Sequence, residues 1–345
     1  MRNVRPVKVG ALTLDGKHIY IQSMLNVPST DIKGSVEQAV RLEKAGCEIV
    51  RAAIPNMDAV QLIPAIKEKI SIPLVADIHF DYKLALAAAD AGIDKIRINP
   101  GNIGDMDRVK AVVAKCTEKH IPIRIGVNGG SLEKDLLAKY GRPCADALVE
   151  SAMGHVRILE KCDFNDIVIS IKSSDVNIMA EAYRKLAAQC DYPLHLGVTE
   201  AGTERMGLIK SAIGIGSLLM EGIGETIRVS LTDEPEKEIY AAGDILKAIG
   251  RGSGVQIVSC PTCGRTRIDL IGLAKKVEEL TKDINKDIKV AVMGCVVNGI
   301  GEAGEADIGI AGGEGKAVIF AHGKKLFTVT EDKALQALMD EIEKL

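Results

Sequence analysis

Hydrophobic and polar positions follow two different periods along most of the chain. Short runs rich in Val and Ile, bounded by Pro, Gly or Asp, are typical of buried strands. These runs cover residues 19–24, 48–54, 72–80, 94–100, 121–127, 166–174, 192–200 and 225–231. The segments between them, such as "SVEQAVRLEKAG" and "YKLALAAADAG", have helical spacing and end on a glycine that suits a helix C-terminus.

The regular alternation of strand and helix patterns predicts a fold of the α/β class with a parallel sheet. Eight such units in roughly 230 residues have the size of a (β/α)8 TIM barrel. A doubly wound open sheet is the structural alternative, but it usually has fewer strands, and no GxGxxG sequence opens a first βα turn. We therefore expect an N-terminal TIM barrel.

The pattern changes after the eighth unit. The glycines and serine of "AIGRGSGV" (248–255) are typical of a linker. Beyond it, "VQIVSC", "IKVAVMGC", "KAVIFAHG" and "KKLFTVT" predict strands, "IDLIGLAKKVEELTKDI" and "KALQALMDEIEKL" predict helices, and glycine-rich loops separate the second strand from the third. The sequence thus predicts two domains, a barrel over residues 1–248 and a small α/β domain over residues 253–345.

Composition excludes several classes of protein. The 345 residues have a net charge of -3 and only 3% aromatic residues, which is unlike a nucleic-acid-binding protein. No apolar run is long enough to span a bilayer and the N-terminus has no signal-peptide core, so we expect a cytoplasmic protein. Eight cysteines in so long a chain do not suggest a disulfide framework. Five occur singly and are predicted to be small packed side chains: Cys47, Cys116, Cys144, Cys162 and Cys190.

Basic residues recur near the carboxyl ends of four predicted strands, where TIM barrels place their active sites. Apolar strands rarely tolerate such residues unless they are paired or bind a ligand. A local ring of cations in a slightly acidic protein suggests an anionic small molecule, above all phosphate or diphosphate. Internal salt bridges between strands are the alternative. The basic residues are Arg51, Arg97, Arg124 and Lys172.

Other polar residues lie at the same strand ends. Asn128, Thr199 and Ser230 are candidates for substrate binding, and Glu200 is the nearest carboxylate that could act as an acid or base. The glycine-rich stretch 214–225 lacks the features of a nucleotide-binding loop, and we expect it to be a connection near the barrel's phosphate region.

Three cysteines stand apart from the others. Cys260 and Cys263 form a C-x2-C pair in "VSCPTCGRTR", and Cys295 follows in "VMGCVVNGIGEAGEAD". A zinc site usually has a second C-x2-C or a histidine pair, and a redox pair would not need the third thiol. We favour a [4Fe–4S] cluster over zinc, a disulfide or simple packing. The nearest hard donors after the third thiol are Asn298, Glu302, Glu305 and Asp307.

Together, the motifs "ADIHF", "IRINPGN", "IRIGVNGGSL", "SIKSSD", "LGVTEAG", "CPTCGR" and "GCVVNGIGEAGEAD" resemble the GcpE/IspG family in its bacterial two-domain form. The likeness runs from residue 22 to the end of the chain. Only the first barrel loop, residues 25–31, departs from the family, which commonly has a threonine-rich stretch there.

The resemblance implies an iron–sulfur oxidoreductase of isoprenoid synthesis. It would reductively open 2-C-methyl-D-erythritol 2,4-cyclodiphosphate and remove water to give (E)-4-hydroxy-3-methylbut-2-enyl diphosphate, with electrons from flavodoxin or ferredoxin. A phosphate-binding barrel lyase or transferase with a structural zinc module is the alternative. The resemblance also implies a head-to-tail homodimer.

The family's functional residues fall on positions already singled out. Cluster ligands would be Cys260, Cys263, Cys295 and an exchangeable Glu302, with Asn298 nearby. Glu200 would be the acid/base residue. The substrate-binding residues would include Arg51, Arg97, Arg124, Asn128, Lys172 and Asn298.

Overall fold

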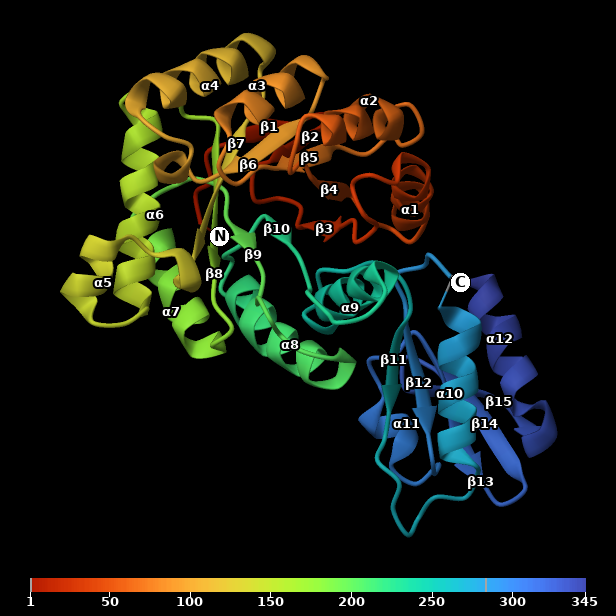
Figure 1. Cartoon of the computed structure of the whole chain (residues 1–345). Helices are drawn as coiled ribbons and strands as arrows, with labels where there is room; N and C mark the ends of the chain where they lie inside the picture. The colour runs from red at the N-terminus through yellow and green to blue at the C-terminus, as the bar shows by residue number, and fades with distance from the viewer. Residues whose placement is uncertain (1, 283) are drawn as a thin grey trace. The chain divides into compact units, whose positions relative to one another are not determined.

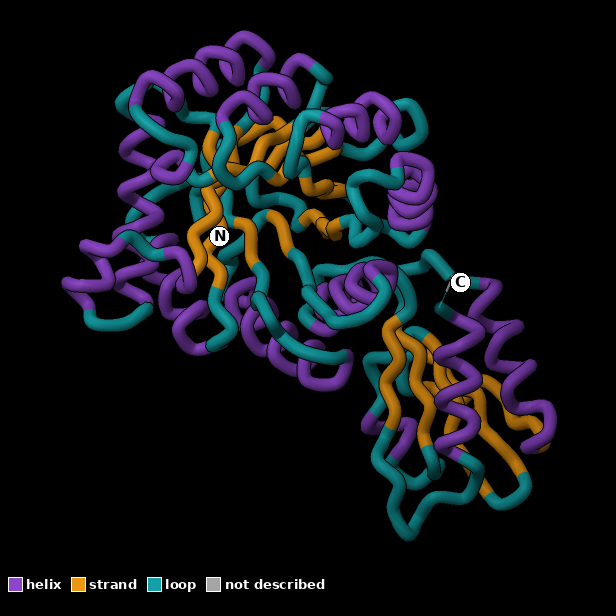
Figure 2. The backbone as a smooth tube through the Cα atoms, viewed as in Figure 1, coloured by secondary structure: helices purple, strands orange, loops and turns teal. Residues whose placement is uncertain are grey.

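The chain forms two compact units, Met1–Ile249 and Gly250–Leu345, which are described separately (Figures 1 and 2). They are seen in a computed structural model that describes residues 2–282 and 284–345. None of the described helices is long and apolar enough to cross a membrane.

Unit 1 is the predicted α/β barrel. Its eight parallel strands have the ring order β8-β7-β6-β5-β4-β3-β10-β9, and a bridge between Ile169 and Leu194 joins the two ends of the ring. Each strand falls on one of the eight predicted runs, and only β7 extends one residue beyond its run, which confirms the fold class. The strands are β3 (Tyr20–Met24), β4 (Ile49–Ala53), β5 (Leu74–Asp77), β6 (Lys95–Ile98), β7 (Ile123–Asn128), β8 (Ile167–Lys172), β9 (His195–Leu196) and β10 (Thr226–Ile227).

Helices surround the barrel, as Figure 1 shows. The predicted glycine ends are confirmed at the first and third helices, where Gly46 and Gly92 have φ of 96° and 88°. The helices are α1 (Ile32–Lys44), α2 (Leu62–Lys67), α3 (Tyr82–Asp90), α4 (Met106–Lys119), α5 (Lys134–Tyr140), α6 (Ala145–Glu160), α7 (Val176–Ala187), α8 (Glu204–Met220) and α9 (Pro235–Ala248).

A short hairpin that the sequence pattern did not predict precedes the barrel. It consists of β1 (Val7–Val9) and β2 (Leu12–Leu14), which pair antiparallel. The buried side chains of Val7, Val9 and Leu14 pack against Val168, the second residue of β8. The hairpin therefore fills the amino end of the barrel interior.

The glycine-rich stretch 214–225 is not the expected connection over its whole length. Its first half belongs to α8, where a Cβ on Gly214 would approach Met179 and Val198 within 2.9 Å. The glycine lets the helix pack closely against its neighbours, so close packing and not ligand binding explains it.

Unit 2 contains a five-stranded sheet with the order β11-β12-β13-β14-β15. The first three strands are parallel and the last two run antiparallel. Leu270 and Val277 of one helix and Leu338 and Ile342 of another pack in its core. The elements are β11 (Gln256–Ser259), α10 (Leu270–Thr281), β12 (Lys289–Met293), α11 (Gly299–Glu302), β13 (Ile308–Gly313), β14 (Lys316–Ala321), β15 (Lys324–Thr330) and α12 (Ala334–Lys344).

The strand β13 was expected to be a glycine-rich loop. A Cβ on Gly309 would lie 2.4 Å from the ring of Phe320 on the neighbouring strand, so the glycine makes room for that ring. The helix predicted over 268–284 is present as α10, and Asp283 at its predicted end lies outside the described residues.

Candidate functional site

Four strands bring basic side chains into the carboxyl end of the barrel. We call Arg51, Arg97, Arg124 and Lys172 the cation ring. Because side chains alternate along a strand, positions such as 95, 97 or 170, 172 point to the same face. The exposed fractions of the three arginines are only 2%, 6% and 0%, in chain order. The cation ring therefore lies inside the barrel and not on its outer surface.

Asp77 is the carboxylate that the cation ring shares. Arg97 Nη1 donates to Asp77 Oδ1 at 3.1 Å, and Arg51 Nε lies 3.7 Å from Asp77 Oδ2. Burial raises the pKa of Asp77, but the three arginines of the cation ring outweigh it and hold that pKa well below its usual value. The internal salt bridges considered from the sequence do exist, but one carboxylate does not balance the cation ring.

Several donors of the cation ring have weak partners or none. Arg51 directs Nη2 and Nε to the thioether sulfur of Met24 at 2.7 and 3.1 Å, and sulfur is a weak acceptor. Among the described residues, Arg51 Nη1 and Arg124 Nε and Nη2 have no hydrogen-bond partner. A buried donor without a partner is costly, so these groups favour a ligand with several anionic oxygens.

The cations also repel one another. Burial, followed by Arg51, Arg97 and Arg124, lowers the pKa of Lys172 to about 6. Burial lowers the pKa of Arg51 to about 10. Such perturbed groups inside a cleft are typical of functional sites.

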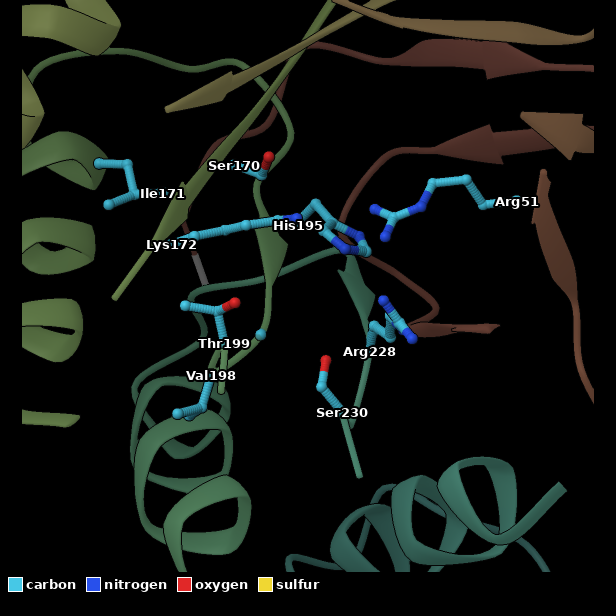
Figure 3. A pocket seen from close by; sticks show the side chains of 10 residues that line it. Arg51, Ser170, Ile171, Lys172, His195, Val198, Thr199, Arg228 and Ser230 are labelled. Atoms are coloured by element: carbon cyan, nitrogen blue, oxygen red, sulfur yellow. The ribbon is translucent and has the colours of Figure 1, made fainter. Parts of the chain in front are cut away.

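An open cavity lies beside the cation ring. Figure 3 shows Arg51 and Arg228 pointing into it from one side and Lys172 from the other, with the hydroxyl groups of Thr199 and Ser230 nearby. Cations and hydroxyl groups on facing walls can bind phosphate oxygens.

The predicted residues differ in their place. Lys172, Thr199, Ser230 and Arg51 line the cavity. Arg97, Arg124 and Asn128 are not part of its wall.

Two of these predicted residues have other contacts. Arg97 Nη2 donates to the Gly126 carbonyl at 3.0 Å. The Asn128 side chain accepts from the Gly130 N–H at 3.3 Å.

Glu200 directly follows Thr199 and is exposed. Its φ of 52° lies in the left-handed region, which non-glycine residues rarely adopt. Residues held in such a conformation cluster at functional sites. The backbone thus marks Glu200 independently of its charge.

Three polar residues outside the predicted set also line the cavity: Ser170, His195 and Arg228. The Arg228 guanidinium donates to both carboxylate oxygens of Glu238 at 3.1 and 3.2 Å. His195 Nδ1 lies 2.8 Å from Thr226 Oγ1, and burial, together with the surrounding cations, lowers the pKa of His195 well below its usual value. Each of the three lies two or four residues before a predicted residue, so strand alternation places it on the same face. This spacing could have identified them from the sequence.

The second candidate site is in unit 2, on the loops that follow β11 and β12. We call residues 260–267 and 294–302 the cysteine loops. Cys260 Sγ accepts the Gly294 N–H at 3.1 Å, and Arg267 N–H donates to the Gly294 carbonyl at 2.9 Å. Hydrogen bonds from Arg265 lower the pKa of the Cys263 thiol, which favours the thiolate that binds metals.

The four predicted ligands all lie on the cysteine loops but do not form a closed site. Cys263 and Glu302 are exposed, whereas Cys260 and Cys295 are half-buried. In residues 2–282 and 284–345, no three His, Cys, Asp or Glu side chains are placed to hold a metal ion. A hydrogen bond with Cys263, together with its charge, raises the pKa of Arg265, and Cys295 and Glu302 add to this effect.

Two of the other hard donors after Cys295, both carboxylates, contact Lys289. Glu305 Oε2 lies 3.8 Å from Lys289 Nζ. Asp307 Oδ2 accepts the Lys289 N–H at 2.7 Å. Asn298 precedes α11, and its side chain makes no capping hydrogen bond there. Glu302, by contrast, acts on the same arginine, Arg265, as Cys263 and Cys295 do.

Fold and site define a TIM-barrel protein with a cation-lined active-site mouth and a cysteine-bearing second unit. The family model of the GcpE TIM-barrel domain matches residues 4–243, and that of the GcpE protein C-terminal domain matches residues 256–344. The chain belongs to the GcpE family.

Curated relatives are similar over nearly the full length. A protein of Fusobacterium nucleatum named 4-hydroxy-3-methylbut-2-en-1-yl diphosphate synthase (flavodoxin) is 59% identical over 339 residues, which are 98% of this chain and 96% of that protein. A protein of the same name from Clostridium perfringens is 58% identical and covers 99% of both chains.

Solved structures show a likeness in the barrel. The 7,8-dihydropteroate synthase of Vibrio fischeri has a TM-score of 0.52 and 15% identity, over 72% of this chain and 97% of that one. The dihydropteroate synthase of Stenotrophomonas maltophilia has a TM-score of 0.52 and 15% identity, over 70% and 96%. At this identity the likeness shows the fold alone.

Proposed function

We propose that the cation ring binds the diphosphate of a cyclic substrate and that the cysteine loops hold the [4Fe–4S] cluster that delivers electrons to it. The chain is an enzyme of isoprenoid synthesis, as its family membership shows. It converts 2-C-methyl-D-erythritol 2,4-cyclodiphosphate to (E)-4-hydroxy-3-methylbut-2-enyl diphosphate by reductive ring opening and loss of water.

The unbalanced positive charge of the cation ring is the observation that carries the substrate-binding part of the proposal. Arg51 donates to a thioether sulfur, which is a weak acceptor. Burial and the neighbouring arginines oppose protonation of Lys172. A diphosphate supplies oxygens for the unpartnered donors and negative charge for the cations. It would bind in the cavity, with Thr199 and Ser230 donating hydrogen bonds to it.

Less direct roles follow for the predicted residues away from the cavity wall. Arg97 and Arg124 add positive charge behind that wall, and Asn128 holds the turn after β7 through Gly130. Direct contact of these residues with substrate remains a prediction. Glu200 is proposed to donate the proton that the loss of water requires, from an exposed position that can exchange protons with solvent.

The chemistry of the cysteine loops fits an iron–sulfur cluster. The Cys260 sulfur already accepts a backbone N–H, as thiolate ligands commonly do, and the Cys263 thiol has a lowered pKa. Cys260, Cys263 and Cys295 would hold the cluster, with Glu302 as fourth ligand and Asn298 nearby. When bound, such a cluster would supply single electrons for the reduction, and Glu302 would be its one ligand that is not a thiolate.

A flavodoxin is the proposed electron donor because the relatives carry that word in their names, with ferredoxin as the alternative. The head-to-tail homodimer and the cytoplasmic location remain predictions. The alternative function, a lyase or transferase with structural zinc, is not favoured, because the likeness to dihydropteroate synthases extends to the barrel fold alone.

Anaerobic purification of Glu302→Ala tests the proposal, with Glu305→Ala as the matched control. We expect the native protein and the control to be brown with broad visible absorption and to turn over the cyclic diphosphate with reduced flavodoxin. Glu302→Ala should keep part of the absorption and lose activity at least about tenfold, because a metal ligand is removed. A colourless native protein with stoichiometric zinc, or a fully active Glu302→Ala, would contradict the cluster assignment.

A further inference from the structure

Lys95 is a buried amine to which the proposed mechanism gives no role. It begins β6 and lies two residues before Arg97, so its side chain points into the barrel interior. Its exposed fraction is 0%, and among the described residues its Nζ has no hydrogen-bond partner. A lysine is rarely buried without a partner, because removing an amine from water costs free energy. Burial of Lys95 therefore costs the fold free energy. A role in the reaction would explain why a lysine occupies this position.

Its neighbours make the amine harder to protonate. Burial, followed by the charges of Arg124 and Arg51, lowers the pKa of Lys95 well below its usual value. Unpartnered donors of Arg124 and of Gln22 lie in the same interior, where Arg124 Nη1 approaches Gln22 Oε1 at 3.5 Å. Among the described residues, this part of the barrel therefore has donors left over that its acceptors do not satisfy.

The charged groups of the barrel interior do not balance. Its basic side chains are Arg51, Lys95, Arg97, Arg124, Lys172 and Arg228. Among the described residues, the carboxylates that pair with these side chains are Asp77 and Glu238, and the second is paired with Arg228. His195 stays neutral because its pKa is lowered. Additional negative charge at the carboxyl end of the barrel would raise the pKa of both amines.

The reaction itself generates such a charge. In the cyclic diphosphate each phosphorus has one ionised oxygen, so the substrate is a dianion. Cleavage of one carbon–oxygen bond leaves that oxygen on its phosphate as a second ionised group. The dianion, two electrons from the reduced carrier and one proton thus give the linear trianion and one water.

We propose that Lys95 stabilises the negative charge that the diphosphate gains when its ring opens, acting through the field of the barrel interior and not by contact with substrate. The inference rests on the proposed function of the cation ring. Lys95 takes up a proton from solvent as the trianion forms, so the barrel binds the linear diphosphate more tightly than the cyclic one. The residue is a positioning charge rather than a catalytic residue.

Lys95→Met tests this inference, because methionine has a similar length and no charge. Calorimetry on the oxidised holoenzyme without reductant gives the affinity for the cyclic substrate and for the linear product, in two buffers of different ionisation enthalpy. We expect the affinity for the linear product to fall roughly tenfold more than that for the cyclic substrate. The extra proton taken up with the linear product should disappear.

Thr226→Val is the matched control, since it changes the same interior without changing its charge. We expect it to alter both affinities by the same factor and to leave the proton uptake unchanged. Lys95→Leu removes the same charge and replaces the methionine variant if that variant does not accumulate.

Stability gives a second readout. In the free protein the Lys95 amine is a buried polar group without a partner among the described residues. Removing such a group in favour of an apolar side chain is often neutral or stabilising, so Lys95→Met should unfold at the same or a higher urea concentration than the native protein. A purely structural lysine would make the variant less stable. An unchanged ratio of the two affinities overturns the role of Lys95, whereas a native protein that binds neither diphosphate overturns the proposed function as well.

Discussion

The two candidate sites are built on different parts of the fold, and they differ in how complete they are. The cation ring stands on barrel strands, with buried arginines whose positions Asp77 and the Gly126 carbonyl help to hold. The cysteine loops are largely exposed, and their thiols do not yet form a ligand set among the described residues. Strands orient side chains without a ligand, whereas loops commonly obtain their final geometry from the metal that they bind.

This difference indicates a division of labour. Under the proposed function, recognition of the diphosphate would depend on a preformed field that costs stability, because the cations repel one another before the ligand arrives. Electron delivery would depend on a site that its cofactor completes. Perturbing one site should therefore leave the other intact.

The largest effect is expected from two variants, each of which inactivates one of the two sites, first alone and then combined in one dimer. Arg51→Ala and Cys263→Ser should each abolish turnover, the first by loss of substrate and the second by loss of the cluster. In a head-to-tail homodimer, mixing and refolding the two variants creates one site with both native halves, so about a quarter of the native activity should return. The measurement is turnover with reduced flavodoxin.

Cys162→Ser, at a half-buried lone cysteine, serves as the control and should keep full activity. If the mixture stays as inactive as either variant alone, both halves of the site come from the same subunit. Substrate binding by Cys263→Ser should match that of the native protein. Weaker binding would contradict the inference that the two sites act independently.

A smaller but substantial effect is expected from Asp77→Asn. Removing the carboxylate leaves buried arginines without their shared partner, which should cost about 3–5 kcal/mol in the free energy of unfolding. Inorganic diphosphate should restore part of this loss, because it supplies negative charge to the cation ring. Urea unfolding with and without diphosphate measures both effects.

Glu221→Gln provides the comparison at the surface, where Glu221 pairs with Arg184 in solvent. Exposed ion pairs contribute little, so this variant should unfold almost like the native protein. Equal unfolding midpoints for Asp77→Asn and the native protein would show that the cation ring does not depend on its carboxylate.

The smallest predicted effect is a pH dependence of substrate binding. Because the pKa of Lys172 is lowered to about 6, its amine is mostly neutral above that pH and binding of a dianion must add a proton. The dissociation constant should then rise by up to about tenfold per pH unit above about pH 6 and level off below it. Calorimetric titrations across this range measure the change.

Lys172→Met should bind more weakly and lose this dependence. A native dissociation constant that stays flat from about pH 6 to about pH 8 would show that Lys172 keeps its proton in the free protein.

Periodic patterns predicted the architecture well. All eight barrel strands fall on predicted runs, β7 ending one residue beyond its run, because each strand is buried on both faces. The hairpin Val7–Leu14 was missed, since strands of three residues are too short for a period to show. β13 was missed because its glycines are typical of a loop. In the structure, Gly309 makes room on this strand for the ring of Phe320.

By itself the sequence determined where basic residues and cysteines stand along the chain, because strand alternation and motif spacing are local. Only the tertiary structure decided which of them meet. Gln22 and Arg124, on strands far apart in the sequence, become neighbours through closure of the barrel. The same closure brings His195 and Arg228 to the cavity and leaves Lys95 without a partner, since burial and charge depend on every strand at once.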